Sequence, residues 1–263
     1  IMRIIVCVKQ VIDTAARIEI KDGKVDGVGL SRVLNPYDEF AIEEALKIRE
    51  SKPDTNITLV SLGPESFGDA LRAGLAMGAD KAVHLLDPVF DGLDSLTISR
   101  LLGKAVESLG FDLIFCGRQA VDIDMAQIGP ALAVYLKIPC VTVVTDLEFS
   151  ENWGVAIATR QIEGGSEIIE SPIPVLLTCQ KGLNQPRLPS FKGIMAAKKK
   201  QIEILDAGKL GFVPSVITNE ASTTISTGLE LPLLRSNVEI LDGPINDSVV
   251  KLVKALREKE KVV

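Results

Sequence analysis

The residues best suited to chemistry lie in one stretch, 116–130, which reads Cys-Gly-Arg-Gln-Ala-Val-Asp-Ile-Asp-Met-Ala-Gln-Ile-Gly-Pro. An apolar run ending at Phe115 precedes it and a helical pattern follows it, so it lies at the carboxyl end of an expected parallel strand. Open α/β sheets bind their ligands at that end. Gly117 allows close approach of the backbone, Arg118 supplies a positive charge, and free N–H groups at the helix start would bind a phosphate.

The acidic residues of this stretch suggest further roles. Asp124 and Gln127 have the spacing of a helix N-cap and its partner three positions later. Asp122 and Asp124 would repel an anion, so we assign them to helix capping or to ribose hydroxyls. Pro130 would then fall inside the helix and kink it, which keeps a helix start nearer Gln127 open. An ordinary strand–turn–helix connection without a ligand is the alternative.

Signatures of other chemistries are missing from the sequence: it has no G-x-G-x-x-G after the first strand, no Walker A loop and no G-x-S-x-G elbow. The single histidine, His84, lies in a strand pattern, where we expect a core residue with satisfied hydrogen bonds. Glu43 and Glu44 are expected on a solvated helix face, and lysines 198–200 on the surface. We predict no catalytic residue and no metal site, so that redox work would depend on a cofactor.

Composition limits the classes of function. The chain has 263 residues, of which 46% are hydrophobic and 24% charged, as in globular proteins. A net charge of −6 and an aromatic content of 4% argue against a nucleic-acid partner. We find no signal peptide and no apolar run near the ~18 residues of a membrane span, so we expect a cytoplasmic protein without membrane insertion. The cysteines lack metal or redox spacing and are expected to be buried thiols: Cys7, Cys116, Cys140 and Cys179.

The elements around this stretch alternate between strand and helix. Such alternation predicts an α/β fold with a doubly wound, mostly parallel sheet, Rossmann-like or adenine-nucleotide α-hydrolase-like. Asn35 and Pro36 are a helix cap and first residue, and Asp22-Gly23 marks a hairpin within 17–33. Loops at 9–14, 63–66 and 117–124 should share one rim with the helix start at Asn35. Strands are expected at 3–9, 57–62, 82–86, 113–115 and 140–145, and helices from 35, at 66–77, at 93–109 and near 131–136.

The pattern changes after residue 145. The segments 147–160, the one after Gly165, and 175–179 are expected to be antiparallel strands. Residues 184–200 are typical of an exposed loop that enters a helix. Residues 206–245 are irregular, and 247–259 form an amphipathic helix with Val249, Val250, Leu252, Val253 and Leu256 on its apolar side. A segment this loosely organised is either disordered or ordered by a partner.

Several segments match a known family. The sequence ATRQIEGGSEIIESPIPVLLT at 158–178 resembles the signature of the electron transfer flavoprotein β subunit at every constrained position. The stretch 116–130 resembles that family's nucleotide loop. The match covers nearly all of residues 2–211, while the tail beyond is family-like in placement but weakly marked. Further matching segments fall at 8–10, 35–38, 77–80, 184–187 and 194–200.

The resemblance implies a heterodimer with an α subunit that holds a mobile FAD, while the sheet of this chain holds a second nucleotide. In housekeeping members that nucleotide is a structural AMP. In electron-bifurcating members it is FAD, which takes hydride from NADH. One electron then goes to ferredoxin or flavodoxin, and the other goes through the α-subunit flavin to a flavin-dependent dehydrogenase of the acyl-CoA, enoyl-CoA or lactate type.

Two residues favour the bifurcating type. Arg118 stands where housekeeping members usually have lysine, and Asp38 stands where they usually lack an acid. Ile123 departs from the pattern, because bifurcating relatives commonly have glycine there, and its side chain adds bulk near the nucleotide.

The resemblance also assigns residues and domains. The family's partner-docking loop falls on 187–195, with Phe191 as its apolar anchor; the alternative is a residue packed on its own domain. Residues 1–205 would form the nucleotide-binding domain, with an antiparallel extension at about 146–180 and the docking loop at about 184–197, and 206–263 a C-terminal arm on the α subunit. Docking residues are Arg187, Phe191, Ile194 and Met195. Cofactor contacts fall on Cys7, Lys9, Asn35, Tyr37, Asp38, Gly63, Cys116, Gly117, Arg118, Gln119, Ala120, Val121, Asp122, Asp124, Met125, Ala126, Gln127 and Ile128.

Two other classes of function compete with this assignment. A stand-alone nucleotide-sensing module of the stress-protein type shares the α/β sheet but would need neither the docking loop nor the long tail. A hydrolase would need a nucleophile and a base, which the sequence does not offer.

Overall fold

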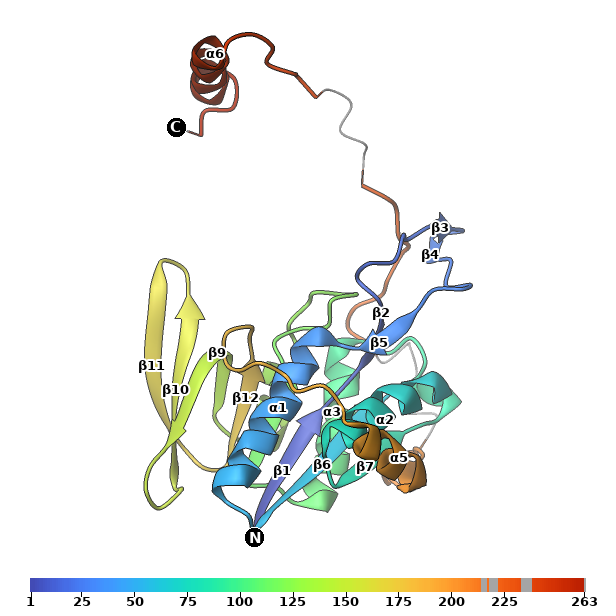
Figure 1. The fold of residues 1–263 in the computed structure, drawn as a ribbon. Helices are drawn as coiled ribbons and strands as arrows, with labels where there is room; N and C mark the ends of the chain where they lie inside the picture. The colour runs from blue at the N-terminus through green and yellow to red at the C-terminus, as the bar shows by residue number, and fades with distance from the viewer. Residues whose placement is uncertain (214–216, 218–221, 233–237, 263) are drawn as a thin grey trace. The chain divides into compact units, whose positions relative to one another are not determined.

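The computed structural model describes residues 1–213, 217, 222–232 and 238–262 (Figure 1). The chain divides into two compact units. The first comprises residues 1–17 and 27–227, and the second comprises residues 18–26 and 228–263. The expected irregular segment 206–245 includes 214–216, 218–221 and 233–237, which lie outside the described residues.

A nine-stranded sheet forms the centre of the first unit, with the strand order β11-β10-β9-β12-β8-β1-β6-β7-β13. The strands from β9 to β13 in this order pair in parallel, while β10 pairs in antiparallel with both β9 and β11. The predicted doubly wound, mostly parallel sheet is confirmed. Its strands are β1 (Met2–Cys7), β6 (Thr55–Leu62), β7 (Lys81–Leu85), β8 (Leu113–Gly117), β9 (Cys140–Phe149), β10 (Val155–Ile162), β11 (Gly165–Pro172), β12 (Val175–Cys179) and β13 (Ile202–Leu205).

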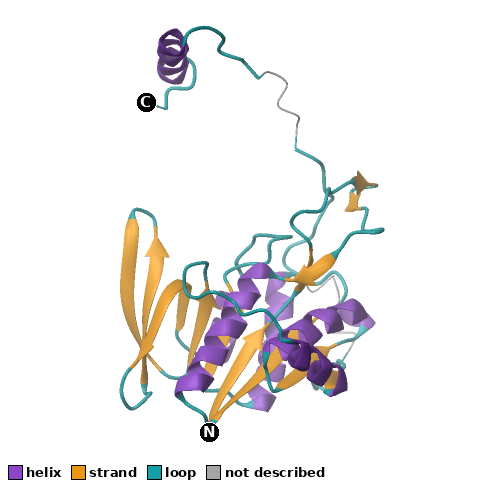
Figure 2. Cartoon of the chain, in the orientation of Figure 1, coloured by secondary structure: helices purple, strands orange, loops and turns teal. Residues whose placement is uncertain are grey.

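Helices cover both faces of the sheet, which is why its central strands are apolar throughout. In β1, Ile4 and Val6 join the core under one layer of helices, and Ile5 and Cys7 join the core under the other. Figure 1 shows α1 and α2 in front of the sheet and α3 behind it, and Figure 2 shows the same layers by type. The first layer contains α1 (Pro36–Ser51), α2 (Gly68–Met77) and α5 (Phe191–Lys199), and the second contains α3 (Ser95–Leu109) and α4 (Ile128–Leu136).

The order of the strands reverses between β1 and β8. From β1 the chain proceeds to β6 and β7 on one side, and then crosses to β8 on the other side of β1. Cys7 and Cys116 are register partners at this point. In open α/β sheets the crevice outside the carboxyl ends of two such strands is the usual place for a ligand. The stretch 116–130 begins there.

The prediction that 175–179 is antiparallel was wrong. β12 lies between β8 and β9 and runs parallel to both. The antiparallel part starts further along β9, where Val143 has a φ of 62° and donates its N–H to Thr178 Oγ1 at 2.9 Å. A β-branched residue in this conformation marks a bulge that bends the strand. β9 therefore pairs in parallel with β12 as far as Val144, and in antiparallel with β10 from Val144 onward.

Two further segments add to the predicted outline. A short pair of strands, β2 (Gln10–Ile12) and β5 (Arg32–Leu34), leads into α1. The edge strand β13 was not predicted, although Ile202-Glu203-Ile204-Leu205 alternates between apolar and acidic residues before its last position. Residues after it continue to pack in the core, since Ala207 and Leu210 are buried with α3.

The second unit contains a hairpin and a helix. The strands β3 (Ile20–Lys21) and β4 (Lys24–Val25) pair around Asp22 and Gly23, both with positive φ, so the predicted turn is confirmed. Gly23 O accepts a hydrogen bond from Leu229 N at 2.9 Å. The predicted C-terminal helix is confirmed as α6 (Ile245–Glu258), and its apolar residues Val249, Val250, Leu252 and Val253 are exposed within the described chain.

Candidate functional site

A buried carboxylate holds the rim of the sheet together. Asp38, in the first turn of α1, is 5% exposed. Its Oδ2 accepts the N–H of Lys9 at 2.7 Å, and its Oδ1 accepts the N–H of Gly117 at 3.2 Å and Nδ2 of Asn35 at 2.9 Å. One side chain thus joins the ends of β1 and β8 to the start of α1. Its observed contacts organise the site, and a direct contact with a ligand stays a prediction.

Asn35 takes the N-cap position of α1, as predicted, but its side chain makes no capping bond. Its Nδ2 also donates to Gln119 O at 2.9 Å, and its Oδ1 accepts the N–H of Val121 at 3.2 Å. The amide is therefore used to hold the loop after β8. The sequence indicated the cap position, but a bond to residues more than eighty positions away has no local signal.

Burial raises the pKa of Asp38 to about 7, against the opposing effect of the bonds from Asn35, Lys9 and Gly117. A group with this pKa changes its protonation near neutral pH, at the point where three segments of the site meet.

Gly117 is required by this close packing. A Cβ at this position would lie 2.2 Å from Asp38 Oδ1 and 2.8 Å from the carbonyl carbon of Tyr37. The predicted close approach at Gly117 is confirmed, but the atoms that approach belong to the start of α1. Tyr37 thereby lies against the end of β8.

The loop after β8 is held at its base and exposed at its tip. A turn closes at Ala120 O, which accepts the N–H of Asp124 at 2.8 Å. Lys9 Nζ bonds both oxygens of Asp122 at 2.8 Å. Gln119 Nε2 bonds Asp124 Oδ1 at 2.5 Å. Both carboxylates that could repel an anion therefore have partners, and residues 122–127 are exposed.

The predicted capping box was wrong. α4 starts at Ile128 with Gln127 as N-cap, no side chain caps it, and Asp124 bonds Gln119 instead. The reason is Pro130, which a helix tolerates only in its first turn. The alternative start near Gln127 is confirmed.

The start of α4 has the features of an anion site. Asp124 and Ala126 have φ values of 55° and 52°. Left-handed residues alternating with right-handed ones gather successive N–H groups into a concave surface that binds anions. Within the described chain, the N–H groups of Met125, Ala126 and Gln127 have no acceptor. The helix dipole of α4 adds positive potential at the same place.

The cysteines near the rim contribute buried thiols. Cys7 and Cys116 are 7% and 4% exposed, so their side chains lie in the core beneath the rim. A hydrogen bond from the Cys116 thiol to Cys7, together with burial, raises the pKa of Cys116 well above its usual value. The cysteines are free thiols, as expected; Cys7, Cys116 and Cys179 are buried and Cys140 is half-buried.

The other predicted cofactor residues lie at or near the same rim. Arg118 is half-buried, and its N–H donates to Cys179 O at 2.9 Å. Ile128 O accepts from Ser99 Oγ at 3.3 Å, and Met125 lies near Ser95 on α3. Gly63 follows β6 with a φ of 158° and packs against Phe67, which directly precedes α2, and its N–H donates to Leu85 O of β7 at 3.2 Å.

Two predictions about polar residues had different outcomes. His84 is a buried strand residue whose Nε2 lies 3.0 Å from Gly63 O, as expected for a core histidine. The prediction that Glu43 and Glu44 lie on a solvated face was wrong, because they are 5% and 3% exposed. Both accept hydrogen bonds from the segment that follows β12.

The docking loop, residues 184–197, lies on α1 and α2. Arg187 forms an ion pair with Glu43, so it anchors the loop on its own subunit. Phe191 is 80% exposed, and Ile194 and Met195 are 40% and 44% exposed. The expectation of an exposed Phe191 is confirmed, while a partner contact through Arg187 stays a prediction. A groove of about 530 Å³ lies between α2 and this loop, lined by Asp69, Arg72, Ala73, Ala76, Pro189, Ile194, Ala197 and Lys198.

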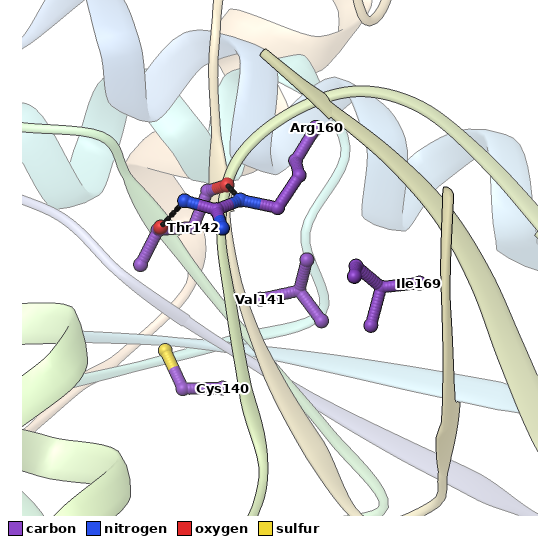
Figure 3. A pocket seen from close by; sticks show the side chains of 5 residues that line it. All are labelled: Cys140, Val141, Thr142, Arg160 and Ile169. Atoms are coloured by element: carbon purple, nitrogen blue, oxygen red, sulfur yellow. Dashed lines mark hydrogen bonds between the residues drawn. The ribbon is translucent and has the colours of Figure 1, made fainter. Parts of the chain in front are cut away.

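A smaller cavity of about 110 Å³ lies away from the rim, on β9, β10 and β11 (Figure 3). Arg160 turns its guanidinium toward Thr142, bonding its carbonyl and hydroxyl oxygens at 3.1 Å each. Glu167 pairs with the same guanidinium. Burial raises the pKa of the Cys140 thiol beside it to about 11. These contacts stabilise the bend in β9, and the thiol stays protonated.

Comparison with known families decides the class of this protein. Residues 22–210 match the electron transfer flavoprotein domain. This chain belongs to the electron transfer flavoprotein family. It is 41% identical over 260 residues to the electron transfer flavoprotein subunit beta of Thermoanaerobacterium thermosaccharolyticum, covering 98% of this chain and 99% of the relative. It is also 38% identical over 265 residues to the subunit beta of Bacillus subtilis, covering 100% of both chains.

A third relative comes from a larger assembly. The caffeyl-CoA reductase-Etf complex subunit CarD of Acetobacterium woodii is 39% identical over 261 residues, covering 98% of this chain and 99% of that subunit. This chain is thus an electron transfer flavoprotein β subunit, which implies an α subunit as its partner and a redox role for the complex. In the described part of the chain, no helix has the length and apolar character needed to cross a membrane.

Proposed function

We propose that this electron transfer flavoprotein β subunit binds FAD at the rim between β1 and β8, within a bifurcating complex that oxidises NADH. The observation that carries the proposal is the start of α4. Its unpartnered N–H groups at Met125, Ala126 and Gln127 lie on an exposed loop at the reversal point of the sheet.

The residues at this rim fit the phosphates of a nucleotide. A pyrophosphate group needs N–H donors, no unpaired carboxylates nearby, and access from solvent. The α4 start supplies the donors, Lys9 and Gln119 neutralise or bond Asp122 and Asp124, and residues 122–127 are exposed. Asp38 and Asn35 would hold the loop in the shape that receives the ligand.

The choice of FAD over AMP rests on Arg118 and Asp38. Arg118 is half-buried beside the loop, where a fixed positive charge would favour negative charge on a bound flavin. Ile123, 58% exposed at the loop tip, points against the bifurcating type because it adds bulk near the ligand. The relative named as part of a caffeyl-CoA reductase-Etf complex supports a role beside a CoA-dependent reductase.

Bound FAD would supply the chemistry that side chains lack: acceptance of two electrons from NADH and their separate release, to ferredoxin or flavodoxin and, through the α-subunit flavin, to a dehydrogenase. The chain itself binds and orients the cofactor and shapes its electrostatic surroundings. Asp38, with its pKa raised to about 7 by burial, can hold or release a proton at the base of the site.

Two surfaces fit the proposed partners. The docking loop presents Phe191 and Met195 to solvent, and the dehydrogenase would bind there. In the second unit, α6 has an exposed apolar face formed by Val249, Val250 and Leu252, which would pack on the α subunit. NADH and ferredoxin as co-substrates are consistent with a complex that works in the cytoplasm.

A housekeeping β subunit with structural AMP is the second candidate, since the same N–H groups would hold a single phosphate and Ile123 favours the smaller ligand. A stand-alone nucleotide module is a third candidate, and it predicts that the purified chain is stable by itself and free of flavin. The exposed apolar face of α6 argues against this third candidate.

The substitution Arg118→Glu tests the site. With negative charge beside the loop, we expect the complex with the α subunit to assemble but to lose the nucleotide of the β subunit, measured by nucleotide extraction and chromatography. The matched control is Arg100→Glu, at an exposed position of α3. Unchanged nucleotide content in Arg118→Glu would refute the assignment.

A further inference from the structure

The exposed apolar residues of the docking loop belong to a segment that is fixed at both ends. Leu188 and Phe191 are 91% and 80% exposed, which is unusual for large apolar side chains near an ordered helix. The chain enters this region through Arg187 and leaves it through Lys200. Each of these residues is bonded to a helix or turn of the main sheet unit.

The entry is held by two glutamates of α1. Arg187 donates from its backbone N to Glu43 Oε2 at 3.0 Å, from Nε to the same oxygen at 2.8 Å, and from Nη2 to Glu43 Oε1 at 2.8 Å. Its Nη1 bonds Glu50 Oε1 at 2.8 Å. Glu43 and Glu50 lie about two turns apart on one face of α1, so the planar guanidinium spans both carboxylates.

A second contact reinforces the first. Asn184 Nδ2 donates to Glu44 Oε2 at 2.9 Å and to Phe40 O at 3.0 Å. Glu44 is 3% exposed and also pairs with Lys47 at 3.1 Å. Burying two adjacent carboxylates is costly unless both are paired and bonded. The contacts of this segment meet that condition, so the buried charges bind the segment in one arrangement.

The exit is held by α2 and the turn that follows it. Arg72 Nη1 donates to Ala197 O at 2.6 Å and to Lys200 O, which satisfies the last carbonyls of α5. Lys200 Nζ donates to Ala79 O at 2.5 Å. Ser190 caps the start of α5 by accepting the N–H of Gly193 at 3.0 Å.

We propose that Glu43 is a positioning residue for partner docking: its ion pair with Arg187 holds the loop, before any partner arrives, in the arrangement that presents Leu188 and Phe191. This inference rests on the proposed docking role of the loop. A surface ordered in advance loses less conformational entropy on association, so its affinity is higher for the same contacts. Arg187 then acts within its own subunit, and the apolar side chains meet the partner.

The test measures electron transfer from the complex with the α subunit to or from a flavin-dependent acyl-CoA dehydrogenase with its acyl-CoA substrate, as a function of dehydrogenase concentration. Glu43→Gln keeps the size of the side chain and removes its charge. We expect the KM for the dehydrogenase to rise about fivefold with kcat and flavin content unchanged. Amides of residues 188–195 should exchange hydrogen faster in this variant.

The matched control is Glu107→Gln, which removes the same charge from an exposed position of α3. If Glu43→Gln fails to fold, Glu50→Gln removes only the more exposed of the two carboxylates that pair with Arg187, and it should raise the KM by a smaller factor. A KM for Glu43→Gln, or for Glu50→Gln in its place, equal to that of Glu107→Gln would overturn the proposal.

Phe191→Ala distinguishes the docking role of the loop from the positioning role of Glu43. It removes a docking contact and leaves the ion pairs of Arg187 with Glu43 and Glu50 intact. A raised KM in Phe191→Ala with an unchanged KM in Glu43→Gln refutes the positioning role alone. An unchanged KM in both variants refutes the docking role of the loop, and the positioning role with it. A raised KM in both, with faster exchange at 188–195 only in Glu43→Gln, supports the proposal.

Discussion

The substitution Gly117→Ala tests whether the rim depends on the close packing of β8 against the start of α1. The added Cβ would lie 2.2 Å from Asp38 Oδ1 and 2.8 Å from both Tyr37 C and Tyr37 Cβ, where ordinary contact begins at 3.4 Å. The carboxylate would have to move by about an ångström, and the backbone of Tyr37 would have to move as well. Overpacking of this kind costs about 1–3 kcal/mol.

The loss of stability should come from particular hydrogen bonds at the rim. Moving Asp38 weakens its bond to Gly117 N first, and then its bonds to Lys9 N and Asn35. Because Asn35 also holds the loop through Gln119 and Val121, we expect the variant to lose nucleotide as well as stability.

The assay combines chemical denaturation, for the free energy of unfolding, with nucleotide extraction from the complex. Gly165→Ala is the control, because a Cβ there meets nothing within 4 Å and the position does not have a left-handed φ. A Gly117→Ala variant that matches Gly165→Ala in both stability and nucleotide content would refute the packing argument.

Two further outcomes follow from the site and one from the docking loop. Burial raises the pKa of Asp38 from 3.8 to about 7, so the native state binds the proton of this carboxyl more tightly than the unfolded state does. The protonated carboxyl contributes roughly 4 kcal/mol to the free energy of unfolding. This contribution is complete below pH ~4 and is lost as the pH rises through ~7. Denaturation curves between pH 4 and 8 should show this decline in the wild-type protein and not in Asp38→Asn; parallel curves would contradict it. Lys9→Met should leave Asp122 unpaired beside the proposed phosphate site and weaken nucleotide binding about tenfold or more by calorimetry, whereas equal affinities would exclude a role for this ion pair. Gly193→Ala should destabilise the docking loop by about 1–3 kcal/mol, because its Cβ would lie 2.4 Å from Ala76 O; an unchanged free energy of unfolding would contradict that contact.

The strand and helix pattern was largely predictable from the sequence because its signals are local. Apolar runs such as 4–8 and helix-start residues such as Asn35 and Pro36 act within a few positions, and the structure places elements accordingly. The direction of β12 was not predictable in this way. Parallel and antiparallel strands have similar composition when both faces are buried, and the bulge at Val143 that changes the pairing depends on contacts with another strand.

The site likewise combines features that the sequence predicts with features that depend on contacts between distant residues. The position of the loop at 117–124 follows from its place after a strand, and the start of α4 follows from the backbone chemistry of Pro130. The uses of Asn35, Asp38 and Glu43 depend on partners far away in the chain, which the fold brings together. Buried glutamates in a helix resemble solvated ones in sequence, and only the fold shows that Glu43 is paired with Arg187 and that Glu44 is bonded by Asn184.

The central claim is that FAD lies at the rim between β1 and β8. The most direct test is to purify the complex of this chain with its α subunit, record its visible spectrum and count the nucleotides released on denaturation. We predict two FAD molecules and no AMP for each pair of subunits, with both flavins bleached by NADH. One FAD with one AMP, or a second flavin retained by the α subunit alone, would contradict it.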